Sequence, residues 1–252
     1  MPAEINLSAG TVALVTGGSR GIGQAIAARL RLAGATTLTC ARRPAPADEH
    51  CLTCDVRDAT QVQALIDTIA NRHGRLDIVV NNAGGSPEAA ADTVSPRFSE
   101  TIIALNLLAP LYMSQAANRI MQTQNSGGVI INIASVSGTR PSPGTAAYGA
   151  AKAGLLNLTQ SLAMEWGPKV RVNAIVAGLI ATEAATGHYG GAKGVDRIGA
   201  MLPLGRMGTP QDIADAVLFL ASPLSAYISG AQLAVHGGGE RPSFLSAVKP
   251  SE

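Results

Sequence analysis

The sequence contains little cysteine, little net charge and no long hydrophobic run, and each scarcity excludes a class of protein. Three of its 252 residues are cysteine, an odd number and too few for the disulfide framework of a secreted domain. Its 19 lysines and arginines nearly balance its 17 aspartates and glutamates, so its net charge is too small to hold nucleic acid by the phosphates. The start shows no basic region followed by an apolar stretch, and no apolar run reaches the length of a membrane span, about 18 residues. We therefore expect a soluble cytoplasmic protein with no nucleic-acid or membrane partner.

The three cysteines, Cys40, Cys51 and Cys54, allow two interpretations. Cys51 and Cys54 have the C-x-x-C spacing of a zinc or redox site, but a closed zinc site needs four ligands and the sequence holds no second pair. In the other interpretation all three are small apolar residues on neighbouring strands. We favour the second interpretation and expect no metal.

Short apolar runs alternate with longer segments of helical period along the chain. This alternation is typical of strand–helix–strand units around a parallel sheet, and the length suits one such domain. We predict one α/β domain over residues 1–252, a doubly wound parallel sheet of about seven strands with helices on both faces. The predicted strands are Thr11–Thr16, Thr36–Cys40, Cys51–Cys54, Leu76–Val80, Val129–Ala134, Val170–Ile175 and Gln232–Val235. The predicted helices are Gly21–Ala33, Thr60–His73, Arg97–Gln124, Ala146–Trp166 and Pro210–Leu220.

Two stretches depart from this alternation. Residues 42–50 are fewer than the dozen or so of a helical crossover, and Pro44 and Pro46 oppose a helix, so we expect a loop or a single turn there. Residues 182–205 are rich in glycine, whose backbone freedom suits a segment that moves, and we interpret them as a mobile substrate lid. Residues 240–252 are expected to form a short tail.

A glycine-rich turn follows the first predicted strand and leads directly into the first predicted helix. It reads Thr16-Gly17-Gly18-Ser19-Arg20-Gly21-Ile22-Gly23, a G-x-x-x-G-x-G spacing that differs from the general dinucleotide fingerprint G-x-G-x-x-G. Glycines here remove the Cβ atoms that would block a pyrophosphate, and the helix amino terminus offers free N–H groups with a partial positive charge. An ordinary tight turn would have a similar composition, but the position after the first strand favours a dinucleotide site.

The residues after the second predicted strand bear on the choice of cofactor. An NAD site usually places a carboxylate there to hold the ribose 2′-hydroxyl, but this sequence reads Cys40-Ala41-Arg42-Arg43. Arg42, together with Arg20 from the glycine turn, can hold a 2′-phosphate by charge-assisted hydrogen bonds. We therefore expect NADP(H) in preference to NAD(H). The alternative is that these arginines are solvated loop residues and that NAD(H) is used.

Asp55 and Val56 follow the third predicted strand. The Asp55 carboxylate is placed where it can accept a hydrogen bond from the adenine amino group, while Val56 covers the ring. The alternative is that Asp55 caps the next turn.

A second group of residues carries proton-transfer chemistry. Tyr148 and Lys152 are four residues apart in a predicted helix, so they lie one turn apart on the same side. A neighbouring ammonium group lowers the pKa of a tyrosine from its usual value near 10, which makes Tyr148 a usable proton donor and acceptor. Ser135 ends a predicted strand at the edge of the sheet where ligands bind. Asn106 lies within a long predicted helix, where a buried amide needs a specific partner.

These residues, the glycine turn and the segment Asn81-Asn82-Ala83-Gly84 resemble the classical short-chain dehydrogenase/reductase family over about residues 8–239. The resemblance implies a Rossmann-type fold and a homo-oligomer, usually a tetramer, with a dimer as the alternative. It implies an oxidoreductase that transfers a hydride between the nicotinamide C4 and the carbonyl or secondary alcohol carbon of a small-molecule substrate.

The resemblance also assigns roles to the four residues of the second group. Tyr148 would be the general acid/base, and Lys152 would lower its pKa while holding the nicotinamide ribose hydroxyls. Ser135 would hydrogen-bond the substrate oxygen, and Asn106 would hold a water in the proton relay behind Lys152.

A larger set of residues would bind the cofactor. Asn82, Ala83 and Gly84 would pass beside the adenosine ribose, and the Ile180 backbone and Thr182 hydroxyl would meet the carboxamide. Two residues depart from the family pattern: Ala177 stands where proline is usual, and His236 stands where aspartate is common. For His236 we expect a local turn hydrogen bond rather than a catalytic role. The full expected set is Gly17, Ser19, Arg20, Gly21, Ile22, Gly23, Arg42, Asp55, Val56, Asn82, Ala83, Gly84, Tyr148, Lys152, Gly178, Ile180 and Thr182.

The substrate pocket would be lined by residues 85–87 and 136–138 and by the 182–205 segment. These residues are mostly small or apolar, which favours a moderately hydrophobic substrate such as a 3-oxoacyl or hydroxyacyl thioester or a steroid-like ketone. Arg140 at the rim either meets an acidic substrate group or is a solvated surface residue. His188 and Tyr189 either stack on the substrate or pack the lid closed.

Two other functions compete with catalysis. The chain can be a regulatory protein that binds NADP(H) without turnover, or a subunit recruited only for assembly. The presence of Ser135, Tyr148, Lys152 and Asn106 argues against the first. The glycine turn argues against the second.

Overall fold

A computed structural model of the chain describes residues 5–43, 49–183, 187 and 189–242. Its centre is one sheet of seven parallel strands in the order β3-β2-β1-β4-β5-β6-β7. Strand order runs outward from β1 in both directions, as in a doubly wound sheet. The strands are β1 (Val12–Thr16), β2 (Thr36–Ala41), β3 (Cys51–Thr53), β4 (Ile78–Asn81), β5 (Gly128–Ser135), β6 (Val170–Ala177) and β7 (Gln232–Val235).

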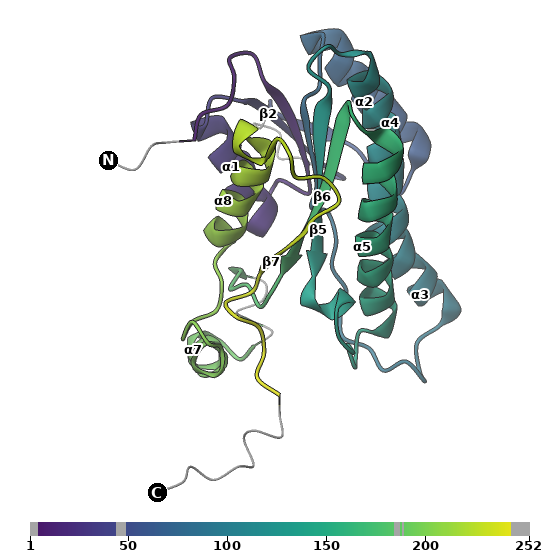
Figure 1. Cartoon of the computed structure of the whole chain (residues 1–252). Helices are drawn as coiled ribbons and strands as arrows, with labels where there is room; N and C mark the ends of the chain where they lie inside the picture. The colour runs from purple at the N-terminus through teal and green to yellow at the C-terminus, as the bar shows by residue number, and fades with distance from the viewer. Residues whose placement is uncertain (1–4, 44–48, 184–186, 188, 243–252) are drawn as a thin grey trace, which may run out of the picture.

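Helices cover both faces of this sheet (Figure 1). The helices α1 and α8 pack against one face, and α2, α4 and α5 pack against the other. Two further helices, α3 and α7, lie near the carboxyl end of the sheet. The helix bounds are α1 (Gly21–Leu32), α2 (Ala59–His73), α3 (Pro96–Ile103), α4 (Ala109–Thr123), α5 (Ala146–Trp166), α7 (Ala192–Met201) and α8 (Pro210–Ala221).

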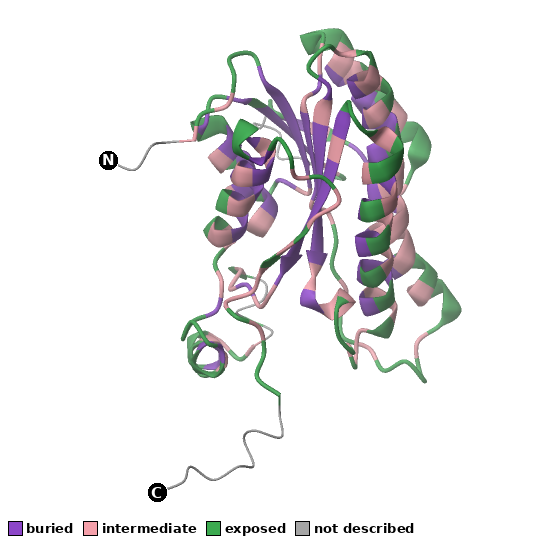
Figure 2. Ribbon diagram, in the orientation of Figure 1, coloured by how far each residue is buried: buried purple, intermediate pink, exposed green. Residues whose placement is uncertain are grey.

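The apolar side chains of the strands pack into a core on each side of the sheet, because successive side chains point to opposite faces. In β1, Leu14 packs with α2 and α4, whereas Val15 packs with α1 and α8. Figure 2 shows the central strands buried along most of their length while each helix keeps an exposed face. Each fully buried Leu, Ile or Val contributes about 1.5–3 kcal/mol relative to exposure, so both helical layers are held by the same strands.

A chain of buried hydrogen bonds crosses the core between the sheet and two helices. Asn81 of β4 donates from Nδ2 to Ser114 Oγ on α4 at 3.0 Å and to Asn132 Oδ1 on β5 at 2.8 Å. Asn132 in turn donates to Thr159 Oγ1 on α5 at 2.9 Å, and Thr159 donates to the carbonyl of Leu155 at 2.8 Å. Since buried amides without partners are costly, this network fixes α4 and α5 in one position on the sheet.

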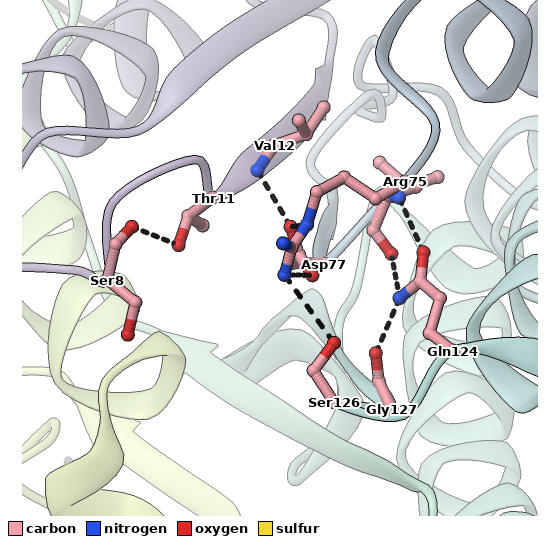
Figure 3. A network of polar contacts seen from close by, with 9 residues as sticks. Ser8, Thr11, Val12, Arg75, Asp77, Gln124, Ser126 and Gly127 are labelled. Atoms are coloured by element: carbon pink, nitrogen blue, oxygen red, sulfur yellow. Dashed lines mark hydrogen bonds and ion pairs between the residues drawn. The ribbon is translucent and has the colours of Figure 1, made fainter.

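The amino ends of the central strands are joined by side-chain hydrogen bonds (Figure 3). Asp77 accepts from the backbone N–H of Val12 at 2.8 Å and pairs with Arg75 through both carboxylate oxygens. Gln124 accepts from the N–H of Leu76 at 2.7 Å and donates to the carbonyl of Gly127, also at 2.7 Å. These bonds satisfy main-chain groups where the strands begin.

The predicted strands and helices agree with the structure to within a few residues, with two differences. The single helix predicted over Arg97–Gln124 is divided: α3 and α4 are separated by a π-helical turn at Ala104–Leu108, in which the N–H of Ala109 bonds to the carbonyl of Ala104. The segment 182–205, for which no helix was predicted, contains α7.

Two glycines of α7 make close contacts that leave no room for a side chain. A Cβ on Gly194 would lie 1.5 Å from the carbonyl oxygen of Tyr189, and a Cβ on Gly199 would lie 3.1 Å from Arg206 Cα. These two glycines therefore permit close packing. The sequence analysis had interpreted the glycines of this segment as a source of backbone freedom, and the mobility of the lid stays a prediction. Parts of the other predicted irregular segments lie outside the described residues. These are 44–48 in the predicted short crossover, His188 in the predicted lid, and 243–252 in the predicted tail.

No helix among the described residues is both long and apolar enough to cross a membrane.

Candidate active site

The glycine turn after β1 is shaped by contacts that exclude side chains. A Cβ on Gly23 would lie 2.3 Å from the carbonyl oxygen of Gly17 and 2.4 Å from Nδ2 of Asn82. Gly17 has a φ of 66° and Gly21 a φ of 55°, which non-glycine residues rarely adopt. The turn is therefore a fixed structure in which glycine is required, rather than an ordinary loop.

The first helix begins with its amino end unblocked. Its N-cap residue, Arg20, makes no side-chain capping bond, and the first turn contains no acidic residue. Ser19 and Arg20 are exposed and Ile22 is half-buried. Free N–H groups and the helix dipole at this end favour an anion, so this cradle fits the pyrophosphate of a dinucleotide.

The Asn-Asn-Ala-Gly segment is bonded directly to the glycine turn. The Oγ1 atom of Thr16 accepts from the N–H groups of Asn82 at 3.0 Å and Ala83 at 2.9 Å. Asn82 donates from Nδ2 to the carbonyls of Thr16 at 2.9 Å and Gly17 at 3.3 Å. One polar network thus fixes both of the predicted cofactor segments that follow β1 and β4.

The predicted cofactor residues at the far edge of the sheet also come together. Arg42 follows β2, is exposed, and lies close enough to Asp55 to lower the pKa of its carboxyl group. Val56 is buried beside the ends of β2 and β3. Arg20 and Arg42 make no hydrogen bond or ion pair with another side chain in the part of the chain that the structure describes, so their guanidinium groups are available to a phosphate.

The Asp55 carboxylate has a partner that the sequence analysis missed. Arg57 donates from Nε at 2.9 Å and from a terminal nitrogen at 2.6 Å to the two carboxylate oxygens of Asp55. This bidentate hydrogen bonding is the main cause that holds the pKa of Asp55 below its usual range. Asp55 also accepts from the N–H of Arg57 within the turn, whereas Asp58 caps helix α2 by accepting from Thr60 and Gln61.

The catalytic pair predicted on α5 lies against the end of β5. Lys152 is 3% exposed and donates from Nζ to the carbonyl oxygen of Ile133 at 2.8 Å. Its Nζ lies 5.6 Å from the centre of the Tyr148 ring. Ser135 ends β5 two residues beyond Ile133, and its side chain lies close enough to Tyr148 to act on the pKa of the phenol. The structure therefore brings the predicted serine, tyrosine and lysine into one site.

The pKa of Tyr148 differs from the sequence-based expectation. Burial raises it above its ordinary value of 10, and the hydrogen bond from Ser135 offsets only part of that effect. Burial also lowers the pKa of Lys152 to about 8. The expected lowering of the Tyr148 pKa by Lys152 was therefore wrong for this arrangement, because desolvation of the phenolate is the larger effect.

Asn106 lies in the π-helical turn and is fully buried. Its Oδ1 accepts from the N–H of Gly85 at 2.9 Å, and its Nδ2 donates to the carbonyls of Gly85 at 3.0 Å and Ile102 at 2.9 Å. A Cβ on Gly84 would lie 2.7 Å from this Oδ1 and 3.4 Å from Lys152 Nζ. Both N–H groups of the amide are thus used by the backbone, and one lone pair of Oδ1 is left to accept from the predicted relay water.

The segment after β6 reaches back to the glycine turn. A Cβ on Gly21 would lie 3.7 Å from Cγ2 of Thr182, so Thr182 stands beside the start of α1. Ile180 forms a bridge with Gly208, and Gly178 donates to the carbonyl of Val235 at 3.0 Å. These bonds place the predicted carboxamide contacts next to the predicted pyrophosphate cradle.

The two departures from the family pattern have local explanations. Ala177 is the last residue of β6 and is buried, so it is held by the sheet. A Cβ on Gly178 would lie 2.6 Å from the Cβ of His236, and the carbonyl of His236 accepts from Gly239 in a turn. The predicted turn hydrogen bond of His236 is thus made by its main chain.

One ion pair near Ser135 could not be predicted from the sequence. Arg140, five residues beyond Ser135, is paired with Glu240 from the end of the described chain. The two residues are 100 positions apart, and no local pattern connects them.

The chain is similar to proteins of known activity over most of its length. Residues 17–240 match a family model described as enoyl-(acyl carrier protein) reductase. The sequence is 37% identical over 242 residues to D-threitol dehydrogenase of Mycolicibacterium smegmatis, covering 91% of this chain and 92% of that protein. It is 40% identical over 243 residues to a 3-oxoacyl-[acyl-carrier-protein] reductase of Vibrio harveyi, covering 91% and 97%. The ligand-free aldohexose dehydrogenase of Thermoplasma acidophilum superposes with a TM-score of 0.86 at 32% identity, covering 96% of each chain.

Proposed function

This chain belongs to the short-chain dehydrogenase/reductase family and is an oxidoreductase acting on hydroxyl or carbonyl groups; we propose that it reduces a moderately hydrophobic carbonyl compound with NADPH. The observation that carries the proposal is the position of Tyr148 close to Ser135 and beside the buried ammonium group of Lys152. A proton donor, a group that orients the substrate oxygen and a positive charge are what carbonyl reduction requires of a protein.

The proton in this reaction comes from Tyr148. Because burial raises its pKa, Tyr148 is protonated at neutral pH and ready to donate to a substrate oxygen. Ser135 holds that oxygen within reach of the phenol, and Asn106 with Lys152 forms the path by which the proton is replaced. The bound nicotinamide supplies the hydride. The reverse path oxidises a secondary alcohol.

The cofactor is held by four groups of residues. The glycine turn and the amino end of α1 receive the pyrophosphate, and Asn82, Ala83 and Gly84 lie beside the adenosine half. Gly178, Ile180 and Thr182 are on the nicotinamide side, and Asp55 and Val56 are at the adenine. The fit rests on the contacts at Gly17 and Gly23, which leave no room for side chains in this cradle.

Preference for NADP(H) rests on Arg42 and Arg20. Both are exposed at the adenosine end, and no carboxylate directly follows β2 among the described residues to hold a free 2′-hydroxyl. Titration of the protein with NADPH and NADH, followed by nicotinamide energy transfer, tests this preference. We expect tighter binding of NADPH and loss of that advantage in Arg42→Ala. Equal or tighter binding of NADH in the unaltered protein would contradict it.

The proposed substrate class is supported by the small residues near Ser135 and by the similarity to a 3-oxoacyl-[acyl-carrier-protein] reductase. The similarity to a D-threitol dehydrogenase and an aldohexose dehydrogenase is the reason to test polyols as well. Residues 136–138 form a short 3₁₀ turn directly after Ser135, and a Cβ on Gly138 would lie 2.7 Å from the backbone of Lys152. A screen of 3-oxoacyl thioesters, steroid-like ketones and short polyols against NADPH tests the proposal. Turnover of polyols alone would contradict the hydrophobic class.

Turnover itself separates catalysis from a purely regulatory role. Tyr148→Phe removes the proton donor while keeping the ring, so it should abolish turnover and leave NADPH binding intact. A protein without turnover for any substrate, whose NADPH binding alone changes its partners, would support the regulatory alternative.

We also propose a cytoplasmic homo-oligomer, a tetramer or a dimer. All three cysteines are free thiols, as suits a reducing compartment. On the outer face of α5, Met164 is 87% exposed, and on another face of the same helix Trp166 lines a groove together with Tyr112 of α4. Light scattering of the protein and of Met164→Glu tests this assembly, and an unaltered monomer would contradict it.

A further inference from the structure

An ion pair joins two segments that are 100 positions apart in the chain. A terminal nitrogen of Arg140 donates to Oε1 of Glu240, and the other terminal nitrogen donates to the carbonyl of Pro141 at 2.9 Å. The Arg140 and Glu240 side chains are 38% and 35% exposed. The guanidinium group is thus held in place but remains open to solvent.

Arg140 lies two residues beyond a turn that contacts the predicted catalytic residues. The 3₁₀ turn Val136–Gly138 begins directly after Ser135, and the N–H of Ser137 donates to the Ser135 side chain at 3.2 Å. A Cβ on Gly138 would lie 2.7 Å from the backbone of Lys152, so this turn packs closely against α5. Arg140 is therefore joined to the site by a short and tightly packed segment.

Glu240 belongs to a segment whose position depends on glycine. The residues Gly237, Gly238 and Gly239 have φ values of 65°, 93° and 84°. Leu204 donates to the carbonyl of Gly237 at 3.2 Å, and a Cβ on Gly238 would lie 2.8 Å from Pro203. The turn before Glu240 is thus packed on the segment after α7, and Figure 1 shows α7 and the last described residues at the end of the molecule where β5 and β6 terminate. Glu240 itself lies just beyond this packed glycine turn.

The pairing is easily exchanged for an equivalent one. A solvent-exposed ion pair contributes little net free energy, because the carboxylate is well solvated when released. The guanidinium group binds any carboxylate in the same planar geometry. A substrate carboxylate can therefore replace that of Glu240 at little cost, and Glu240 already shows that the space around Arg140 accommodates this group.

We propose that Arg140 is a specificity-determining residue that selects carbonyl or alcohol substrates carrying a carboxylate at the end remote from the reacting carbon, which it binds in exchange for Glu240. The proposal rests on the proposed oxidoreductase function and adds a substrate class to it. The substrate would have an apolar middle, which suits the small residues near Ser135, and a charged far end.

Matched acids and esters test the proposal. The probes are methyl ketones with a terminal carboxylate, 4-oxopentanoate to 9-oxodecanoate, and their methyl esters, each with saturating NADPH and separately with NADH so that cofactor preference does not enter. For the acid of best-fitting length we expect kcat/KM to exceed that of its ester by about threefold, as an exposed ion pair formed in exchange for another allows. The advantage should lie mainly in KM, since Arg140 contacts the remote end.

Two variants act in opposite directions. Arg140→Ala should lower kcat/KM for the acid by about threefold, which removes its advantage over the ester, and leave the ester unchanged. Glu240→Gln removes the competing carboxylate and should raise kcat/KM for the acid by about threefold. Arg72→Ala, at an exposed arginine in the last turn of α2, is the matched control and should change neither. Circular dichroism melts of each variant exclude loss of folding as the cause.

The outcomes distinguish this inference from the function it rests on. Turnover of acids and esters with the same ratio in the unaltered protein and in Arg140→Ala overturns the inference alone. Absence of turnover for every probe and for neutral ketones overturns the proposed function and the inference with it.

Discussion

Lys152 and Ile133 are joined by a hydrogen bond of 2.8 Å from the ammonium group to a main-chain carbonyl. The bond ties the middle of α5 to β5, two residues before Ser135 ends that strand. A buried ammonium group that donates to a carbonyl loses less free energy on leaving water than an unpaired one, but its charged form is still disfavoured. This explains why its pKa falls to about 8.

The stability of the protein should therefore depend on pH above neutrality. Because the folded pKa of Lys152, about 8, lies below the ordinary value of 10.5, the unfolded state binds more protons between these values and the free energy of unfolding rises with pH across that range. Below pH 8 the free-energy cost of burying the charged ammonium group is fully present. Lys152→Met should flatten the rise, and guanidinium unfolding at intervals from pH 7.5 to about pH 10.5 measures it. An unchanged slope in the variant would contradict the assignment.

Oxidation of an alcohol should require alkaline pH more than reduction does. The oxidative direction needs the phenolate of Tyr148, and burial raises the pKa of that group above 10, so kcat for oxidation should climb through the alkaline range while reduction stays level at neutral pH. Ser135→Ala removes the hydrogen bond that lowers this pKa and should move the climb to higher pH. Ser161→Ala, on the exposed side of α5, should leave the profile in place.

Gly23→Ala should abolish cofactor binding. Its Cβ would lie 2.3 Å from the carbonyl of Gly17 and 2.4 Å from Asn82 Nδ2, so the turn must shift, at a cost in stability of about 1–3 kcal/mol. Isothermal titration with NADPH measures the loss of binding. Gly167→Ala is the control, since Gly167 has a φ of −63° and its Cβ would meet only the carbonyl of Ala163 at 3.5 Å. Normal NADPH affinity in Gly23→Ala would disprove the cradle.

Thr159→Val should destabilise the fold by about 1–3 kcal/mol. It keeps the volume of the side chain but removes the acceptor of Asn132 Nδ2, which then stays unsatisfied in the core. Thr159→Ser retains the hydroxyl and should recover part of this loss. Urea unfolding of the three proteins gives the comparison, and equal midpoints for valine and threonine would show that the network contributes nothing.

Arg57→Ala should raise the pKa of Asp55 toward 3.8. The bidentate hydrogen bonds of Arg57 are the main cause of the lowered value, and a depressed carboxyl pKa adds stability that is present above pH 3.8 and is lost as pH falls through the folded pKa. The variant should lack this contribution. Carbon-13 NMR of the Asp55 carboxyl gives its midpoint directly, and Arg57→Lys should give an intermediate value.

Local patterns predicted most of the fold because each element carries its own signal. The bounds of α5 follow from a long helical period, and those of β7 from a short alternating run ended by glycines. The π-helical turn around Asn106 has no such signal, because it depends on hydrogen bonds between its amide and Gly85, 21 residues away. Helix α7 was missed because Gly194 and Gly199 were interpreted through their flexibility, whereas tertiary packing requires them.

The candidate site was predicted in its members but less well in its energetics. Ser135, Tyr148 and Lys152 meet as expected because strand ends and helix turns fix their positions. The direction of the Tyr148 pKa shift depends on how much surrounding chain excludes water, which spacing does not reveal. The pairs Asp55–Arg57 and Arg140–Glu240 depend on side-chain orientation and on distant segments.

The hydrogen bonds of Asp77 and Gln124 at the amino ends of the strands have a practical consequence for protein engineering. They stabilise the sheet at the end opposite the catalytic residues. Loops at the opposite end can therefore be randomised or exchanged in directed evolution while these hydrogen bonds stay intact. The natural positions for such a library are residues 86–90 and 139–142, which lie outside both the cofactor cradle and the hydrogen-bonded end of the sheet.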